Sequence, residues 1–463
     1  MIKRITRHSY FHYSICLLLV SVICVRAGAQ TYAEPEQEQL LNGLKVLFWQ
    51  RPGDANVLLK LRINSGAAFD LAGKDGTMAL LGDVLFPDPA TREYVTEQLG
   101  GQLAVSTNYD GIDVLVSGRA TEFERIVELL RGALVTTQLT PENVARVREA
   151  RIKQLSEKPR SAAEMADRAI AARLFGNFPY GRSPGGSFES LSKIDRADLM
   201  WARERFLNAD NATLVVIGGV AKPRAMRTLR QLIGPWQKSD RTVPATFRQP
   251  SPPDARVLVV NQPGATTAEV RLAIRGLARS DRDYAAMSIL SRIMRARLQV
   301  ALPGVPPNSV IVRHDANALP GIFVFGASVL AGGAPRVILS TRYVMNSLVS
   351  SQPSIAELET TRSEALSELT SQTSQTERIA DNWLDIETYK LPSLSAQITS
   401  IRTITAADVQ RVAIRLFKDA SMAAVAVGDA EQLKTSLGVG VELQNEKAVI
   451  KTAVDPVVPT KKP

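Results

Sequence analysis

The chain has 463 residues, of which 45% are hydrophobic and 22% charged, so it can form two or more domains with buried cores. The net charge is +10, and removing the four basic residues of positions 1–29 leaves 52 Lys and Arg against 46 Asp and Glu, or +6. This mild excess, without a basic run that alternates with aromatic residues, argues against a nucleic-acid partner.

The amino-terminal segment has the pattern of a signal peptide. Lys3, Arg4 and Arg7 precede an apolar stretch at 15–25, and the small residues 27–29 follow it. We therefore predict export to the periplasm with cleavage near Ala29, which leaves no membrane span. The apolar stretch is shorter than the roughly 20 residues that cross a bilayer. An uncleaved anchor is the alternative.

Cysteine and histidine are nearly absent from the rest of the chain. Both cysteines and two of the three histidines lie within 1–29, so His314 alone remains after cleavage. A zinc site usually takes two or three His or Cys ligands. We therefore expect no metal, no disulfide and no cysteine nucleophile in the mature chain.

The first half alternates strand and helix patterns. Residues 31–39 have the composition of a short polar leader, and an apolar helical run lies within 73–86, with Met78, Leu81 and Leu85 on one face. Strands at 103–107 and 112–118 flank Asp110-Gly111, a strong hairpin-turn signal. The other predicted elements are strands at 44–48 and 57–63 and helices at 91–99, 122–134, 140–155 and 162–175.

An internal repeat divides the chain. Residues 194–219 and 404–429 align without a gap at an offset of 210, each as a capped helix, an apolar strand and a glycine turn. Asp198 and Asp408 occupy the same position in the two copies, as do Gly218 and Gly428. The repeat favours two related α/β halves over a chance likeness of two helix–strand units.

The boundaries follow from composition. We predict a signal peptide at 1–29, a first domain at 30–236, a proline-rich linker at 237–254, a second domain at 255–440 and a disordered tail at 441–463. In the second domain we expect strands at 255–261, 268–274 and 321–329, and helices at 284–300, 335–350, 354–369 and 377–389.

Several motifs together resemble the insulinase/pitrilysin-type zinc peptidases. They are the stretches LNGLKV at 41–46, GTMALLGDVLF at 76–86, LGG at 99–101, FPYGR at 178–182 and NATLVVIGG at 211–219. The resemblance covers about 41–437. It implies an α/β (α+β) fold of two homologous halves, each a mixed β-sheet backed by helices, in a clamshell arrangement.

The resemblance also implies that this chain lacks the family's zinc ligands and general base. The family's helix carries His-x-x-Glu-His, two zinc ligands and a general base, and a further Glu downstream completes the site. The matching positions here are Ala79, Gly82, Asp83 and Arg151. Since an arginine repels a divalent cation, these degenerate positions predict neither zinc binding nor catalysis. Gly82 is costly inside a helix and suggests close packing or a local kink.

The chain could bind peptides without cleaving them. The strand Ala104, Val105, Ser106 and Thr107 matches the family's edge strand, which adds a bound peptide to its sheet through main-chain hydrogen bonds. A plain structural strand is the alternative reading. In the second half, the family's substrate-gripping Arg falls at about Pro303, and no Tyr follows it. Neither His314 nor any glycine pair supports another enzyme class, and a lone His on a strand is usually structural.

Two functions fit these observations. The first is a zinc-less homologue that acts as the inactive subunit beside an active zinc-bearing homologue in periplasmic peptide degradation, with no cofactor of its own and zinc only in the partner. The second is a stand-alone periplasmic clamshell or scaffold that binds peptides or proteins. An enzyme active alone is not expected.

Overall fold

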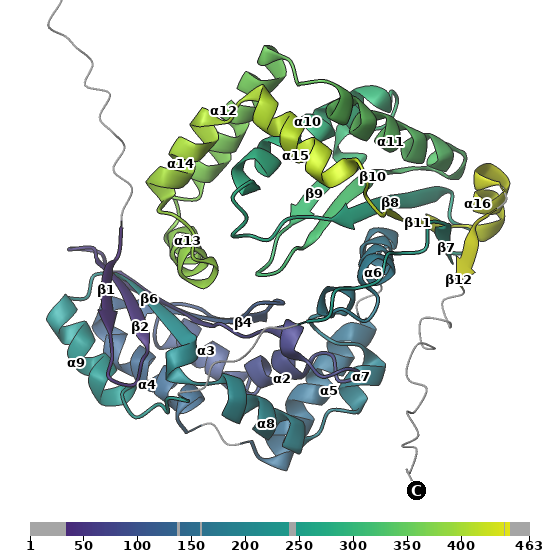
Figure 1. The fold of residues 1–463 in the computed structure, drawn as a ribbon. Helices are drawn as coiled ribbons and strands as arrows, with labels where there is room; N and C mark the ends of the chain where they lie inside the picture. Colours follow the sequence, from purple (N-terminus) through teal and green to yellow (C-terminus); the bar gives the residue numbers. More distant parts are fainter. Residues whose placement is uncertain (1–33, 137–138, 158–159, 240–246, 439, 445–463) are drawn as a thin grey trace, which may run out of the picture. The chain divides into compact units, whose positions relative to one another are not determined.

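Two mixed β-sheets, each backed by helices, organise the chain in the computed structural model (Figure 1). The structure describes residues 34–136, 139–157, 160–239, 247–438 and 440–444, and those from Pro35 on form one unit by their contacts. The predicted signal peptide lies outside the described residues.

The first sheet has the strand order β1-β2-β6-β3-β5-β4. Its strands are β1 (Glu36–Gln39), β2 (Lys45–Gln50), β3 (Asn56–Ile63), β4 (Leu103–Thr107), β5 (Ile112–Arg119) and β6 (Ala212–Gly218). β2 and β6 are parallel and the other neighbours antiparallel. The helices of this half are α2 (Thr77–Asp83), α3 (Ala90–Glu97), α4 (Phe123–Leu134), α5 (Pro141–Glu157), α6 (Ala162–Phe175), α7 (Phe188–Ser192), α8 (Arg196–Phe206) and α9 (Lys222–Leu232).

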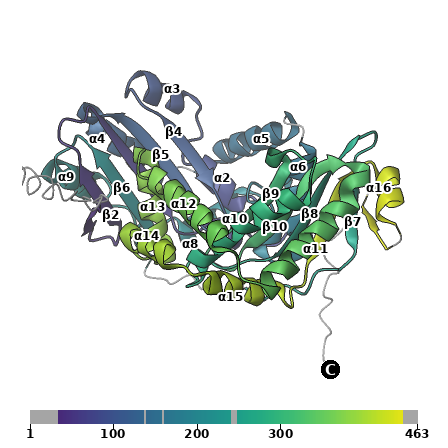
Figure 2. The ribbon, with the colours of Figure 1, turned by 90° about the horizontal axis from the view of Figure 1, so that it is seen from above.

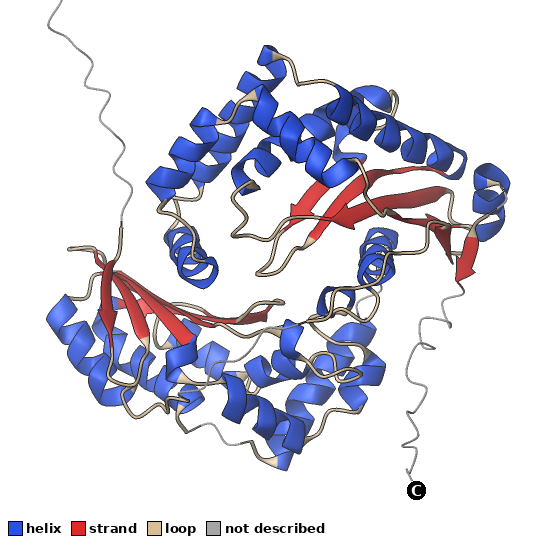
Figure 3. Cartoon of the chain, viewed as in Figure 1, coloured by secondary structure: helices blue, strands red, loops and turns tan. Residues whose placement is uncertain are grey.

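The second sheet repeats this plan in the order β12-β7-β11-β8-β10-β9. Its strands are β7 (Val257–Asn261), β8 (Thr267–Arg275), β9 (Val310–Asp315), β10 (Ile322–Leu330), β11 (Ala423–Gly428) and β12 (Glu442–Gln444). Its helices are α10 (Tyr284–Ala301), α11 (Ala334–Ser350), α12 (Ile355–Ser371), α13 (Thr376–Tyr389), α14 (Leu394–Thr403), α15 (Ala406–Phe417) and α16 (Ala430–Leu437). Five strands correspond in order, from β2-β6-β3-β5-β4 to β7-β11-β8-β10-β9. Figure 3 shows the strands of each sheet in red and the helices that back them in blue.

The repeat predicted at an offset of 210 is confirmed. Its two copies are α8 with β6 and α15 with β11. Each helix begins with a capping box, formed by Asp195 with Asp198 in the first half and by Thr405 with Asp408 in the second. The shared aspartates therefore recur because each closes the first turn of an equivalent helix.

The two halves exchange one helix each. α13 of the second half packs on β3 and β6 of the first sheet, and α6 of the first half packs on β8 and β11 of the second (Figures 1 and 2). On α6, Ile170, Leu174 and Phe175 are buried against Leu258 and Val425 of the second sheet. This shared apolar core joins the halves in the predicted clamshell.

Two short edge strands correct the sequence analysis. Residues 36–39 of the expected polar leader form β1, antiparallel to β2, where Glu36 and Glu38 are paired with Lys222 of α9. Residues 442–444 of the expected tail form β12, parallel to β7. Both strands are polar, so their sequences carry no apolar alternation to reveal them, and pairing with a neighbouring strand stabilises them instead. Residues 445–463 lie outside the described residues.

Candidate functional site

The helix α2 carries the positions that correspond to the metal motif. Asp70 caps it, since one carboxylate oxygen accepts the Gly76 N–H at 2.7 Å and the other the Met78 N–H at 2.8 Å. Gly76 takes a left-handed conformation with a φ of 94°, which lets the chain turn into the helix. Burial raises the pKa of Asp70 to about 7, against the opposing effect of the two N–H donors.

The first two motif positions, Ala79 and Gly82, are buried by the packing around α2. Ala79 is buried in the core. A Cβ atom on Gly82 would lie 3.2 Å from Val105, Thr107 and Ile112. Close packing, one of the two expected reasons for this glycine, is therefore confirmed, and a larger side chain at position 82 would require these three side chains to shift.

The other two positions meet in space. Asp83 ends α2, and Arg151 projects from the middle of α5, so that its Nε donates to Asp83 Oδ2 at 2.7 Å. Both side chains are about a quarter exposed. The predicted correspondence thus brings these two residues together, although they are far apart in the sequence, and an ion pair now joins them.

This arrangement does not fit a divalent metal. The guanidinium of Arg151 already neutralises the only carboxylate among the four positions, and it adds positive charge where a cation would bind. Within the described part of the chain, no group of three or more His, Cys, Asp or Glu residues could hold a metal ion. The chemistry of the four residues therefore provides neither metal ligands nor a base that could activate water.

The strand β4 lies at the edge of the first sheet, beside α2. Ser117 N–H donates to the Gln102 carbonyl at 2.9 Å, and Asn108 N–H donates to the Gly111 carbonyl at 3.0 Å. Since such bonds alternate along an antiparallel pair, the backbones of Ala104 and Ser106 bond to β5. The N–H groups of Leu103, Val105 and Thr107 then point to the other side.

Of the described strands, only β5 pairs with β4. Ala104 and Ser106 are exposed, whereas Val105 and Thr107 are half-buried against α2. The residues predicted to bind a peptide thus form an edge with free backbone donors, which is the geometry that strand addition requires. Whether they bind one stays a prediction.

A charged layer on β3, which β5 separates from this edge, was not predicted. On β3, the nearly buried Lys60 and Arg62 face α13, whose Asp381 lies 2.6 Å from Lys60 Nζ and whose Asp385 lies 2.7 Å from Arg62 Nη1. Arg62 also binds Asp113 through Nε, at 2.7 Å. Although burial alone would lower it, the pKa of Arg62 is raised by these carboxylates.

The sequence contained a signal for this layer. Two cations alternate with leucines in a strand that is otherwise apolar, and α13 has acids at 377, 381 and 385, four residues apart on one helical face. The two patterns are separated by more than 300 residues, so only the fold shows that they are complementary.

The hairpin tip beyond β4 is tied to the second half. Asp110 Oδ2 accepts the Ala318 N–H at 2.9 Å and the Tyr389 hydroxyl at 3.0 Å, and its other carboxylate oxygen accepts the Tyr180 hydroxyl at 3.4 Å. Tyr180 belongs to the FPYGR motif, and Tyr389 ends α13. This motif therefore positions the β4 edge relative to the second half.

His314 has a structural role, as expected for a lone histidine on a strand. Its Nε2 accepts the Leu277 N–H at 3.0 Å, and its ring lies against Tyr284 and Phe323. Burial lowers the pKa of His314 to about 4, which keeps the ring neutral so that it can accept this bond.

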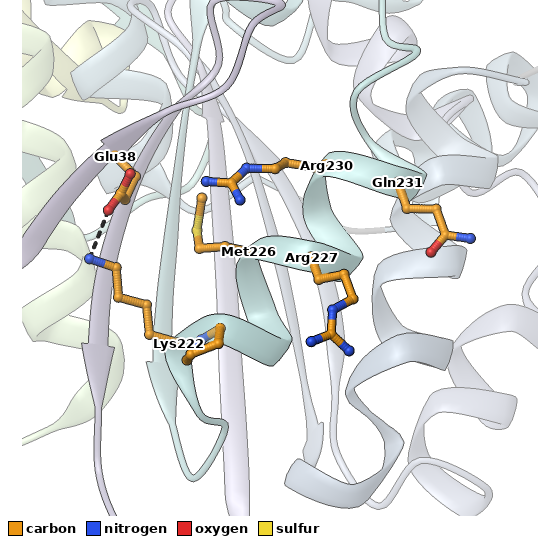
Figure 4. A pocket seen from close by; sticks show the side chains of 7 residues that line it. Glu38, Lys222, Met226, Arg227, Arg230 and Gln231 are labelled. Carbon is orange, nitrogen blue, oxygen red and sulfur yellow. Dashed lines mark ion pairs between the residues drawn. The ribbon is translucent and has the colours of Figure 1, made fainter.

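A surface pocket of about 680 Å³ lies at the opposite edge of the first sheet, between β1 and α9 (Figure 4). Its lining residues are Glu38, Lys222, Pro223, Met226, Arg227, Arg230 and Gln231. Because β1 and β4 are the two outer strands of the sheet, this pocket is separate from the degenerate motif. No described helix is long and apolar enough to cross a membrane.

Comparison with known proteins gives consistent matches. Residues 193–364 match the family described as the Peptidase M16 inactive domain. Subunit 1 of the bovine mitochondrial cytochrome b-c1 complex is 21% identical over 58% of this chain and 58% of its own length. The chain thus matches little more than half of that relative.

Two further matches cover more of the molecule. The mitochondrial-processing peptidase subunit beta of Lentinula edodes is 22% identical over 86% of this chain and 91% of that protein. The crystal structure of a protease from Helicobacter pylori has a TM-score of 0.76 and 16% identity, covering 86% of this chain and all of the other. At such identity the structural match establishes the fold, and the relatives are peptidases or named subunits of larger assemblies.

Proposed function

Because this chain belongs to the insulinase-type (M16) peptidase family as a member without the metal-binding side chains, we propose that it is the non-catalytic subunit of a peptide-degrading complex. The partner is a separately encoded homologue that retains His-x-x-Glu-His and carries the zinc. The complex works in the periplasm, after removal of the signal peptide near Ala29.

One observation carries this proposal. The ion pair between Asp83 and Arg151 occupies the place where two metal-ligand positions meet, while the fold around it is kept. A fold that is maintained around a neutralised site is what a structural or substrate-holding subunit requires, since the zinc chemistry can be supplied by another chain. The named subunits among the relatives support the same reading.

The proposal is tested on the purified mature chain, alone and mixed with the homologue encoded in the same genome. We expect less than about 0.1 zinc per chain by plasma mass spectrometry, because the three ligand positions, Ala79, Asp83 and Arg151, offer a single carboxylate, which is already paired. We also expect no cleavage of peptides by the chain alone, and faster cleavage by the mixture than by the homologue alone. Stoichiometric zinc in this chain, or no effect on the homologue, would contradict the proposal.

The second candidate is a stand-alone clamshell that binds peptides. The free backbone donors of β4 favour it, since they need no partner chain to hold an extended peptide. The discriminating result is a monomer in its native envelope that binds peptides. Fractionation of the source cells, with sequencing of the mature amino terminus, tests the proposed location.

A further inference from the structure

The outer side of α11 is apolar where a solvent-facing helix is usually polar. Leu339 and Tyr343, four residues apart and therefore on one face, are 66% and 72% exposed. Their inward-facing neighbours Val337, Ile338 and Thr341 are buried in the second core. The helix therefore presents apolar side chains on both sides, and only the inner side has a partner within the described chain.

The first half provides an internal comparison. α4 and α11 each follow a 3-10 turn, and each of the six buried positions of α4 corresponds to a buried position of α11 at an offset of 211. The outward positions correspond as well: Arg125 to Arg336, Glu128 to Leu339 and Gly132 to Tyr343, all of them exposed. Two equivalent helices thus share the inner face but differ outside, where only α11 has large apolar side chains.

The surroundings of Leu339 and Tyr343 are apolar and basic. Val300, at the end of α10, is 82% exposed, and it lies close by because the Ser340 hydroxyl donates to the Ala301 carbonyl at 3.2 Å. Arg336 and Arg342 are exposed, and neither forms an ion pair in the described part of the chain. Neither α10 nor α11 contains an Asp, a Glu or a Lys.

We propose that the α11 face, defined as Val300, Arg336, Leu339, Arg342 and Tyr343, docks an acidic amphipathic segment of another protein. Apolar side chains of that segment cover Leu339, Tyr343 and Val300, while its carboxylates pair with the two arginines. This composition is typical of protein–protein interfaces, in which tyrosine and arginine are enriched and lysine is depleted relative to the rest of the surface. A lipid surface would favour lysine as much as arginine, and so it fits less well.

This docking surface is distinct from the proposed function. It lies on the helical layer behind the second sheet, whereas the β4 edge and the degenerate motif belong to the first sheet. The α11 face can therefore be tested whether or not the chain has a zinc-bearing partner.

The test is photo-crosslinking in living source cells. Tyr343 is replaced by p-benzoylphenylalanine, which keeps an aromatic side chain at the centre of the α11 face, and the adducts are identified by mass spectrometry. The control carries the same residue at position 132, the equivalent exposed site on α4, where a Cβ atom would have no neighbour within 4 Å. We expect a discrete protein adduct from position 343 and none from position 132.

Charge dependence is the second readout. In the Tyr343-substituted chain, R336E together with R342E should lower the yield of the adduct at least about tenfold, because the arginines then repel the acidic segment. Thermal melting confirms that these surface variants stay folded. The proposal would be overturned if no adduct formed, if position 132 gave the same adduct, or if the adduct persisted in the charge-reversed variant. It would also be overturned if the adduct joined a lipid, a second copy of this chain, or a segment without Asp or Glu.

Discussion

At the scale of single residues, two positions of the degenerate motif, Ala79 and Gly82, are buried, and the other two, Asp83 and Arg151, neutralise each other. Gly82 permits β4 to approach α2, and Asp83 is paired with Arg151. None of the four motif positions therefore has a side chain that is free to bind a metal. Introducing a single residue of the family motif would therefore disturb the packing or the ion pair without restoring zinc binding.

Gly82 gives the first prediction. Gly82→Gln should lower the free energy of unfolding by about 1–3 kcal/mol, because the added Cβ meets three side chains at 3.2 Å. The control is Gly132→Gln on α4, where the added Cβ meets nothing and the better helix propensity should stabilise by up to about 1 kcal/mol. Urea unfolding measures both. Equal effects of the two substitutions would show that Gly82 is not tightly packed.

His314 gives a prediction about pH. Its pKa is lowered to about 4 in the folded chain, compared with about 6.5 when unfolded. The unfolded state therefore binds more protons between these values, so this contribution to stability is complete above pH 6.5 and is lost as the pH falls toward 4.

The change amounts to roughly 3 kcal/mol for this single group. His314→Gln keeps a hydrogen-bond acceptor for Leu277 N–H but does not titrate. The difference in unfolding free energy between the natural chain and this variant should therefore shrink or change sign between pH 7 and pH 4. A difference that stays constant over this range would contradict the buried, neutral histidine.

At the scale of elements, the exchanged helices use equivalent ion pairs. Lys60 is opposite Val215 in β6, and Arg271 is opposite Val425 in β11, so the two cations, 211 residues apart in the sequence, hold equivalent positions on the central strands. Each pairs with the sixth residue of the exchanged helix: Lys60 with Asp381 at 2.6 Å, and Arg271 with Asp167 at 2.9 Å.

The third prediction tests this pairing. Asp381→Lys should cost about 2 kcal/mol or more, because it leaves the nearly buried Lys60 facing a second cation. Adding Lys60→Asp should recover at least about 1 kcal/mol, since the pair is restored with its charges reversed. The exposed Glu364→Lys on α12 is the control and should change stability by less than about 0.5 kcal/mol. No recovery in the double variant would show that this contact does not join the halves.

The β4 edge gives the fourth prediction. Val105→Pro removes a backbone donor from the free side of β4 without removing a hydrogen bond to β5, so it should abolish the binding of an extended peptide. Ala104→Pro, which breaks the bond to β5, should instead lower the melting temperature. Fluorescence anisotropy with a library of labelled peptides measures binding. Unchanged affinity in a folded Val105→Pro chain would exclude strand addition at this edge.

Most elements could be predicted from the sequence because local signals coincide with them. The hairpin from β4 to β5, the helix α6 and both copies of the repeat follow from turn residues, apolar periodicity and caps. β1 and β12 could not be predicted, because short polar edge strands depend on a neighbour for their hydrogen bonds. The helix around the motif is also shorter than the apolar run suggests, since it ends at Asp83.

At the scale of the whole molecule, the sequence predicted two related halves but not how they are joined. The repeat fixes the equivalence of α8 and α15, yet the exchange of α6 and α13 depends on contacts between residues that are far apart in the chain. The candidate site shows the same division. The four motif positions followed from the resemblance to the peptidase family, whereas the pairing of Asp83 with Arg151 required the fold.

The most direct test of the account is native mass spectrometry of the tagged chain, purified from its own host. We expect a complex of this chain with one homologue that carries His-x-x-Glu-His, in equal amounts, with one zinc ion that remains with the homologue when the complex is dissociated. A chain that purifies alone, or that keeps the zinc ion itself, would contradict the central claim.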